Sequence, residues 1–288
     1  MESIVQKKSK TEAILAGIRN LPSIPKVVFE VTKLLNDPKT TTSQLTELIS
    51  KDQGLTSRIL AVANSPLYGI KRKVSSLEFA VLVLGFGDIR DIVTAISLAD
   101  SIKATPSKYF DPYEFWVHSM VVGTAAKGIS INLGFDFGSE AFVAGILHDM
   151  GILVIYKFLN NEFNQIVDFS NNEKINIIEA EKNILGITHQ EIGKFLAVKW
   201  DLPKVLCETL NYHHSPLTVA DNKNFVSLIH LVDYMTHKLN IGSFYWDKDF
   251  ELDRGIIDIL NFPSEDALDN FIVDYEDTFK VSVESLKL

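Results

Sequence analysis

The sequence predicts an all-α protein, and three observations support this class. Apolar residues recur at helical spacing along the whole chain, runs that alternate with a period of two are short and scarce, and helix start and stop signals flank the periodic segments. Hydrophobic residues make up 46% of the 288 positions and charged residues 23%, so the chain has enough apolar surface for a large core.

The first helices are predicted from their apolar faces and their end signals. The apolar residues between positions 27 and 35 share one helical face, and Asp37-Pro38 ends that helix. Ser75 and Glu78 form a capping box for a helix that ends near Gly85, and Asp88 starts another helix.

A long helix is predicted in the middle of the chain, followed by several shorter ones. It opens at Asp111-Pro112 and closes at Gly134. The later helices are expected to start at Ser139, Asn176, Thr188, Leu202-Pro203 and after Ser264.

Two short amphipathic segments between residues 42 and 63 have the outline of a DNA-binding helix-turn-helix. The second of them offers few donors for bases or phosphates beyond Gln53 and Arg58, and the formal net charge of the chain is -9. We therefore favour an ordinary packed helix pair and expect no nucleic-acid partner.

The stretch from 103 to 112 holds two prolines between strongly helical segments, which indicates a boundary. We expect an N-terminal helical subdomain over 1–107, a helical bundle over 108–240 and a helical extension over 241–288. No secretory signal and no run of apolar residues long enough for a membrane span is visible, and Cys207 has no partner cysteine. These features favour a cytoplasmic protein.

Histidines and aspartates with the chemistry of metal ligands gather in the second half of the chain. The candidates are His118, His148, Asp149, His189, His213, His214 and Asp233. Five imidazoles and two carboxylates suit Fe, Mn, Zn or Ni, and they are enough ligands for two ions that share a carboxylate. Glu114 precedes His118 by one helical turn and is a candidate ligand or supporting residue.

Each of these residues also has an ordinary structural interpretation. Glu114 suits a capping box with Asp111, His189 follows a threonine cap, and a histidine pair near a helix end interacts favourably with the helix dipole. Asp233 could pair with His230 or His237 on its own helix. The spacing alone leaves both interpretations open.

The order of these residues resembles the metal-binding pattern of the HD phosphohydrolase superfamily. The segments LPSIPKVVFEVTKLLNDPKTTTSQLTELISKDQGLTSRILAVANSPLYG and VSSLEFAVLVLGFGDIRDIV resemble the N-terminal part of the HDOD domain, the HD-related output domain of bacterial signalling proteins. The resemblance covers residues 15 to 240. It implies an N-terminal helical subdomain packed on an HD-type bundle.

The resemblance also implies roles for the candidate ligands. His118, His148, Asp149 and Asp233 would bind one metal ion, and His189, His213 and His214 would hold a second ion bridged by Asp149. In hydrolytic relatives, such a pair activates water for attack on a phosphodiester. Asp149 would then be the catalytic residue.

Two departures from the hydrolytic pattern weaken the case for an enzyme. Ile152 stands where the cyclic-dinucleotide phosphodiesterases have a substrate-binding lysine, and Ser215-Pro216-Leu217 stands where they have Gly-Tyr-Pro. We therefore expect a regulatory module that binds a signalling protein or a nucleotide-type ligand, with a divalent metal that orders the bundle. The alternative is a metal-dependent phosphohydrolase acting on a nucleotide or phosphodiester.

Overall fold

The computed structural model describes residues 3–18, 24–241, 246 and 250–286, and within these ranges it contains helices and no strand. The helices before residue 107 are α1 (Ile4–Gly17), α2 (Lys26–Leu35), α3 (Thr42–Ile49), α4 (Gln53–Ala63), the 3-10 helix η1 (Pro66–Tyr68) and α5 (Leu77–Asp100). The bundle helices are α6 (Pro112–Asn132), α7 (Gly138–Leu147), α8 (Met150–Phe158), α9 (Asn160–Glu173), α10 (Ile177–Leu185), α11 (His189–Lys199), α12 (Lys204–Tyr212), η2 (Pro216–Thr218) and α13 (Lys223–Lys238). The last helices are α14 (Ile256–Ile259), α15 (Glu265–Asp274) and α16 (Glu276–Leu286). The all-α prediction is confirmed.

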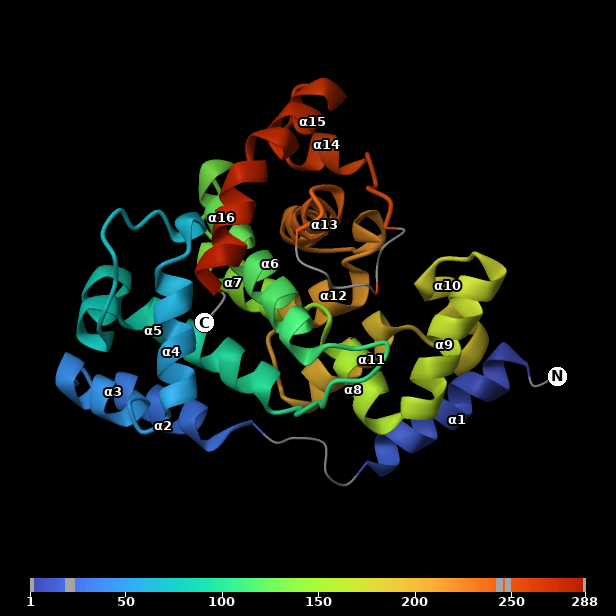
Figure 1. Ribbon diagram of the computed structural model, residues 1–288, viewed down its shortest axis with the longest axis horizontal. Helices are drawn as coiled ribbons and strands as arrows, with labels where there is room; N and C mark the ends of the chain where they lie inside the picture. Colours follow the sequence, from blue (N-terminus) through green and yellow to red (C-terminus); the bar gives the residue numbers. More distant parts are fainter. Residues whose placement is uncertain (1–2, 19–23, 242–245, 247–249, 287–288) are drawn as a thin grey trace.

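Helices α2 to α5 form one side of the molecule, and the bundle forms the other (Figure 1). The predicted break near Gly85 is present within α5, which begins after a cap at Ser76 and reaches Asp100. Gly85 adopts φ 82° and ψ 167°, a conformation that glycine reaches at little cost, so the helix kinks there and continues. The second half of α5 then packs against α7 and links the two sides.

Helix α1 is not packed with the other N-terminal helices. Its main contacts are with α10 of the bundle, and Figure 1 shows it on the side of α9 and α10, away from α2 to α5. The partner of α1 lies about 170 residues later in the chain, where Thr11 Oγ1 donates to Leu185 O. This contact has no counterpart in the local sequence pattern from which the 1–107 subdomain was predicted.

The predicted C-terminal extension over 241–288 is helical where it is described, and it packs closely on the rest of the protein. Helix α16 contacts α6, η1 and α4, so it covers the junction between the two sides (Figure 1). Phe279 and Leu286 of this helix are fully buried. This segment is thus part of the fold's core.

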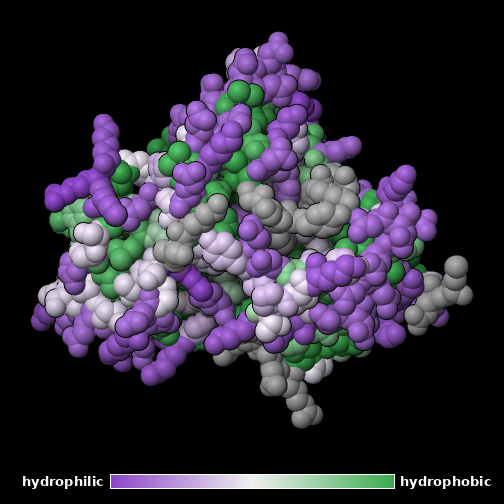
Figure 2. All heavy atoms as spheres, viewed as in Figure 1, coloured by the Kyte–Doolittle hydropathy of each residue, from purple (hydrophilic) through white to green (hydrophobic). Residues whose placement is uncertain are grey.

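One stretch, 138 to 158, is long and apolar enough to cross a membrane by composition. It comprises α7 and α8, and 89% of its most apolar window is buried inside the protein. Such burial is typical of core helices. The face seen in Figure 2 is largely hydrophilic, with small apolar areas between the polar side chains.

The pair α3–α4 forms the predicted two helices between 42 and 63. Leu45, Ile49, Ile59 and Val62 turn inward and are fully buried. Arg58 pairs with Asp100 of α5, so this basic side chain of α4 is engaged within the protein. Packing accounts for these two helices.

Candidate metal centre

The structure brings all seven predicted ligands together in the interior of the bundle. They come from α6, the α7–α8 junction, the start of α11, the end of α12, and α13. Six of them are at most 2% exposed, and His214 is half-buried. Asp149 is shared by two groups of ligand atoms, one with His118 and His148 and one with His189, His213 and His214, while Asp233 is grouped with His118 and His237.

The first group consists of His118, His148, Asp149 and Asp233. His118 Nε2 lies 3.5 Å from Asp149 Oδ2 and 3.3 Å from Asp233 Oδ1. His148 Nε2 lies 3.2 Å from Asp149 Oδ2 and 3.6 Å from Asp233 Oδ1. The two imidazole nitrogens are 3.4 Å apart. Asp233 is included in this group because its Oδ1 lies within 3.6 Å of both imidazole nitrogens.

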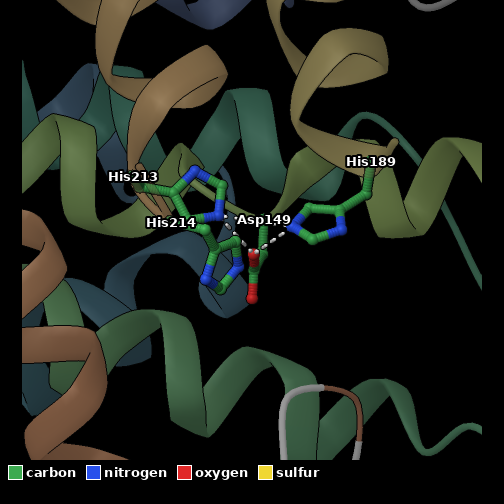
Figure 3. A group of neighbouring side chains, drawn as sticks. All are labelled: Asp149, His189, His213 and His214. Carbon is green, nitrogen blue, oxygen red and sulfur yellow. Dashed lines mark hydrogen bonds and ion pairs between the residues drawn. The ribbon is translucent and has the colours of Figure 1, made fainter. Parts of the chain in front are cut away.

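The second group consists of Asp149, His189, His213 and His214 (Figure 3). Asp149 Oδ1 lies 3.7 Å from His189 Nε2 and 3.5 Å from His213 Nε2. The two imidazole nitrogens are 3.3 Å apart. The His214 ring approaches from the same side as His213, with ring centroids 4.2 Å apart. Asp149 therefore offers one oxygen to each group.

Hydrogen bonds to the outer ring nitrogens determine which way the histidine lone pairs point. His148 Nδ1 lies 2.7 Å from Gly145 O, and His213 Nδ1 lies 3.1 Å from Leu210 O. A carbonyl oxygen can only accept, so both Nδ1 atoms carry the proton. The Nε2 lone pairs of these two histidines consequently face the centre, which is how metal-bound histidines are held.

The residues present fit a pair of divalent ions. Tetrahedral ligands about 2.05 Å from an ion lie roughly 3.3 Å from one another, close to the spacings in both groups. The four carboxylate oxygens of Asp149 and Asp233 are buried and accept no regular hydrogen bond from the described residues, and imidazole nitrogens of the cluster lie 3.2 to 3.7 Å from Asp149 and Asp233. Buried carboxylates are costly unless they are compensated, and two cations would compensate these.

The electrostatics of the two groups differ in the absence of metal. Burial lowers the pKa of His148, but the charges of Asp149 and Asp233 outweigh this effect and raise the pKa well above its usual value. The pKa of His118 is raised by the same balance. In the second group, burial and the neighbouring His214 lower the pKa of His213 to about 3. The first group therefore holds protons where a metal would bind, whereas His213 is neutral.

Two supporting residues were missed by the sequence interpretation, and the first is Glu181 of α10. Its carboxylate accepts from the backbone N of His189 at 2.8 Å and contacts His189 Nδ1 at 2.8 Å, while Trp246 Nε1 donates to it at 2.9 Å. A carboxylate on the outer nitrogen fixes the ring and strengthens a histidine ligand. The only signal in the sequence was a glutamate on the apolar face of a helix.

The second is His237, which the sequence interpretation treated only as a partner for Asp233. His237 Nε2 lies 3.5 Å from Asp233 Oδ1, and with His118 these residues form a third group of possible ligands. The spacing of four residues on α13 was the available signal. Glu114, in contrast, lies half-buried at the start of α6 and belongs to none of the three groups.

Aromatic side chains from the C-terminal segment cover the centre. The Phe250 ring meets the edges of His214, His230 and His237 at centroid distances of 4.6, 5.0 and 6.0 Å. The backbone N of Asp253 donates to His230 Nε2, and His230 Nδ1 donates to His213 O. The segment is thereby tied to the second group.

A pocket of about 340 Å³ adjoins the centre at His214. It is lined by Asn176, Ile177, Ile178, His214, Trp246, Phe250 and Glu251, so no lysine or arginine is among its described lining residues. Ile152, at the position where a hydrolytic relative has lysine, is fully buried in α8. Among the described residues, none of those that line this pocket is a lysine or arginine that could hold a phosphate group.

Comparisons with known proteins agree with this architecture. An HDOD protein of unknown function from Geobacter sulfurreducens matches with a TM-score of 0.76 and 28% identity, over 99% of this chain and all of the other. A Shewanella amazonensis protein named "putative metal-dependent phosphohydrolase" matches with a TM-score of 0.64 and 20% identity, over 96% and 99%. A Marinobacter aquaeolei protein named "putative signal transduction protein" matches with a TM-score of 0.69 and 18% identity, over 100% and 67%.

Among curated sequences, an uncharacterized protein of Treponema pallidum is 22% identical over 279 residues, which are 93% of this chain and 51% of that protein. The chain thus spans about half the length of this relative. The family model of the HDOD domain matches residues 21–216, well over half of the chain. The chain belongs to the HDOD domain family.

Proposed function

We propose that this protein is a cytoplasmic signalling output module of the HDOD type, whose dinuclear metal centre orders the bundle. The observation that carries the proposal is the convergence of seven candidate ligands in the bundle interior, where the described pocket is lined by His214 alone among them. Six of the seven ligands are at most 2% exposed, and Phe250 packs against His214. Structural metal sites are closed, whereas catalytic sites keep a position open for water or substrate.

The origin of the ligands supports an ordering role. They come from five places in the chain between α6 and α13, and burial leaves four of their carboxylate oxygens without a regular hydrogen bond from the described residues. Metal binding to such a set joins these elements in the folded state alone, so its binding free energy stabilises the fold. Asp149, as the shared ligand, would contribute to both ions.

A cavity on the other side of α6 supports binding of a nucleotide-type ligand. It encloses about 740 Å³ between α4, the end of α5, α6 and α8, within the range of small-molecule sites. Its lining includes Tyr113, Trp116, Arg58 and Lys103. Aromatic rings can stack on a base, Lys103 can meet a phosphate, and Arg58 can do so where the phosphate displaces its partner Asp100. The pocket at His214 has no comparable pair of cations among its described lining residues.

The second candidate function is a metal-dependent phosphohydrolase. It is favoured by the bridging position of Asp149, whose two oxygens serve the two groups as a two-metal hydrolase requires. When bound, the ions would supply charge stabilisation and an activated water. The residues of this chain would supply the bridge through Asp149 and the orientation of His189 through Glu181. The burial of six of the seven candidate ligands and the absence of a cation at Ile152 favour the regulatory function.

Ligand binding and hydrolysis are tested together with a fluorescent purine nucleotide, methylanthraniloyl-ATP, and with bis(p-nitrophenyl) phosphate. We expect binding of the nucleotide that weakens in Arg58→Ala and Trp116→Ala, remains in Asp149→Asn, and is accompanied by no turnover of the diester. Arg254→Ala, which removes an exposed arginine paired with Asp269, is the matched control. Metal-dependent turnover that disappears in Asp149→Asn would favour the hydrolase instead.

A further inference from the structure

Helix α1 is attached to the junction between α10 and α11, and this junction carries His189. Lys8 Nζ lies 2.7 Å from Glu191 Oε1, and Thr11 Oγ1 donates to Leu185 O at 2.8 Å. Lys7 Nζ donates to Asn183 O. The helix therefore satisfies carbonyl groups at the end of α10 and contacts the first turn of α11.

Gly186 lets the two backbones approach closely at this junction. It ends α10 with φ +78°, and a Cβ atom there would lie 2.3 Å from Lys8 N and 2.6 Å from Ile4 O. No side chain can occupy that space unless α1 moves. The fit between α1 and the junction is thus specific for a glycine at this position.

The same junction positions His189 for the second group. Glu191 uses Oε2 to accept from Thr188 N at 3.0 Å, which caps α11 one residue before His189, and uses Oε1 for Lys8. Glu181 of α10 holds His189 Nδ1 from the other side. One glutamate therefore connects α1 directly to the cap that sets the position of this ligand.

The attachment of α1 is weak compared with that of the bundle helices. Only Thr11 and Leu15 are buried among its residues, and Ile4 and Val5 are 56% and 77% exposed. The Lys8–Glu191 pair is about two-fifths exposed on each side, so the surrounding water reduces its strength. Undocking of α1 consequently exposes little apolar surface and leaves the bundle core intact.

We propose that α1 is a strap that regulates the second metal site. With α1 docked, the α10–α11 junction holds His189 toward Asp149, and with α1 released the junction loosens and the affinity for the second ion falls. The first group has no part in this, because its ligands lie on α6, the α7–α8 junction and α13, none of which shares extensive contacts with α1. This inference rests on the proposed metal centre.

Gly186→Ala in the full chain tests the strap, with Gly134→Ala as the matched control. Gly134 has a similar φ of +82°, but a Cβ added there meets nothing within 4 Å, so it reproduces the backbone strain without the contact to α1. The measurements are hydrogen exchange of the amides in α1 and in residues 185–191, and Co²⁺ titration followed by the d–d absorption of each equivalent.

We expect Gly186→Ala to raise the rate of amide exchange in α1 and in residues 185–191. The affinity for the second Co²⁺ ion should fall by about tenfold, the scale of a lost supporting contact, while the affinity for the first is unchanged. Lys8→Glu, which opposes Glu191 without a steric change, should act in the same direction, and Lys8→Arg should behave like the unaltered protein. Faster exchange of the α1 amides without a change in either Co²⁺ affinity would contradict the strap hypothesis and leave the metal centre in place. An unaltered protein that binds no Co²⁺ would overturn the metal centre as well.

Discussion

In the first group of ligands, His118 and Asp233 project from within two long helices, whereas in the second group His189 and His213 lie at helix ends. His118 is the seventh residue of the 21-residue α6, and Asp233 is the eleventh of the 16-residue α13. His189 is the first residue of α11, and His213 follows the last residue of α12. A helix interior holds its side chains rigidly, while helix ends depend on caps and neighbouring loops.

In the proposed centre, this difference would give one ion a fixed site and the other an adjustable site. The first group depends on core packing of α6 and α13 and on the fully buried α7–α8 junction, which carries His148 and Asp149. The second depends on Glu181, Glu191 and the segment that includes Trp246, and these residues lie outside the ligand set. Changes that spare the core should therefore act on the second ion and leave the first.

Removal of the shared ligand should have the largest effect on metal binding, because it should affect both ions and so abolish the difference between the two groups. Asp149→Ala takes one oxygen from each group, so both ions should be lost, and with them the stability that bound metal adds, about 4 kcal/mol when free metal exceeds Kd a thousandfold. The measurements are metal analysis and thermal unfolding. Asp269→Ala, at an exposed aspartate, should retain both ions; equal metal content in the two variants would contradict the shared role.

Single removal of a histidine from each group should separate the two ions. His118→Ala should abolish binding of the first ion and His189→Ala binding of the second. The reason is that His118 is not in the second group of ligands and His189 is not in the first. Metal analysis after equilibration with Zn²⁺ should give about one equivalent in each variant. Loss of both ions in either variant would show that the two groups bind as one unit.

The pH dependence of metal binding should also distinguish the two groups of ligands. Protons on His118 and His148, whose pKa values are raised, compete with the first ion, whereas His213, with a pKa of about 3, stays neutral. Acidification from pH 8 to 6 should thus release the first ion before the second, as measured by competition with a chelator. Release in the opposite order would contradict the assignment.

The stability of the metal-free protein should fall as the pH rises, whereas metal binding should strengthen. A pKa of His148 that is higher in the folded state than in the unfolded state stabilises the fold below the unfolded pKa, and this stability is lost as the pH rises through the folded value. Chelator-treated protein should therefore unfold more easily at pH 9 than at pH 6. Thermal unfolding at both values tests this, with His148→Gln expected to flatten the dependence.

The smallest effect should come from Glu181. Glu181→Gln keeps the size of the side chain but removes the charge that orients His189, so the second ion should bind 10- to 100-fold more weakly with the first unaffected. Titration with Co²⁺ measures both affinities. An equal loss at both ions would indicate a general destabilisation of the bundle.

Much of the fold and of the site could be predicted from local sequence signals. The caps at Asn176, Thr188 and Ser264 are present as predicted, because a cap depends on residues three positions apart. The seven ligands were identifiable because buried histidines and aspartates in an apolar context must be compensated. Their convergence was implied by resemblance, and only the distances between their atoms confirm it.

Contacts between distant parts of the chain could not be predicted in this way. The position of α1 follows from its fit to Gly186, and the role of Glu181 follows from a contact with Trp246 that spans 65 residues. Neither pair has a characteristic spacing in the sequence. Glu114 shows the converse, since a favourable spacing from His118 did not bring it into any group of ligands.

Metal analysis of the protein purified without chelator tests the central claim most directly. The account predicts close to two equivalents of Fe, Mn, Zn or Ni per chain, since the ligand atoms form two groups around Asp149. One equivalent would limit the centre to a single ion. Less than about a tenth of an equivalent, with no uptake on addition of these metals, would contradict the claim that the histidine and aspartate cluster is a metal centre.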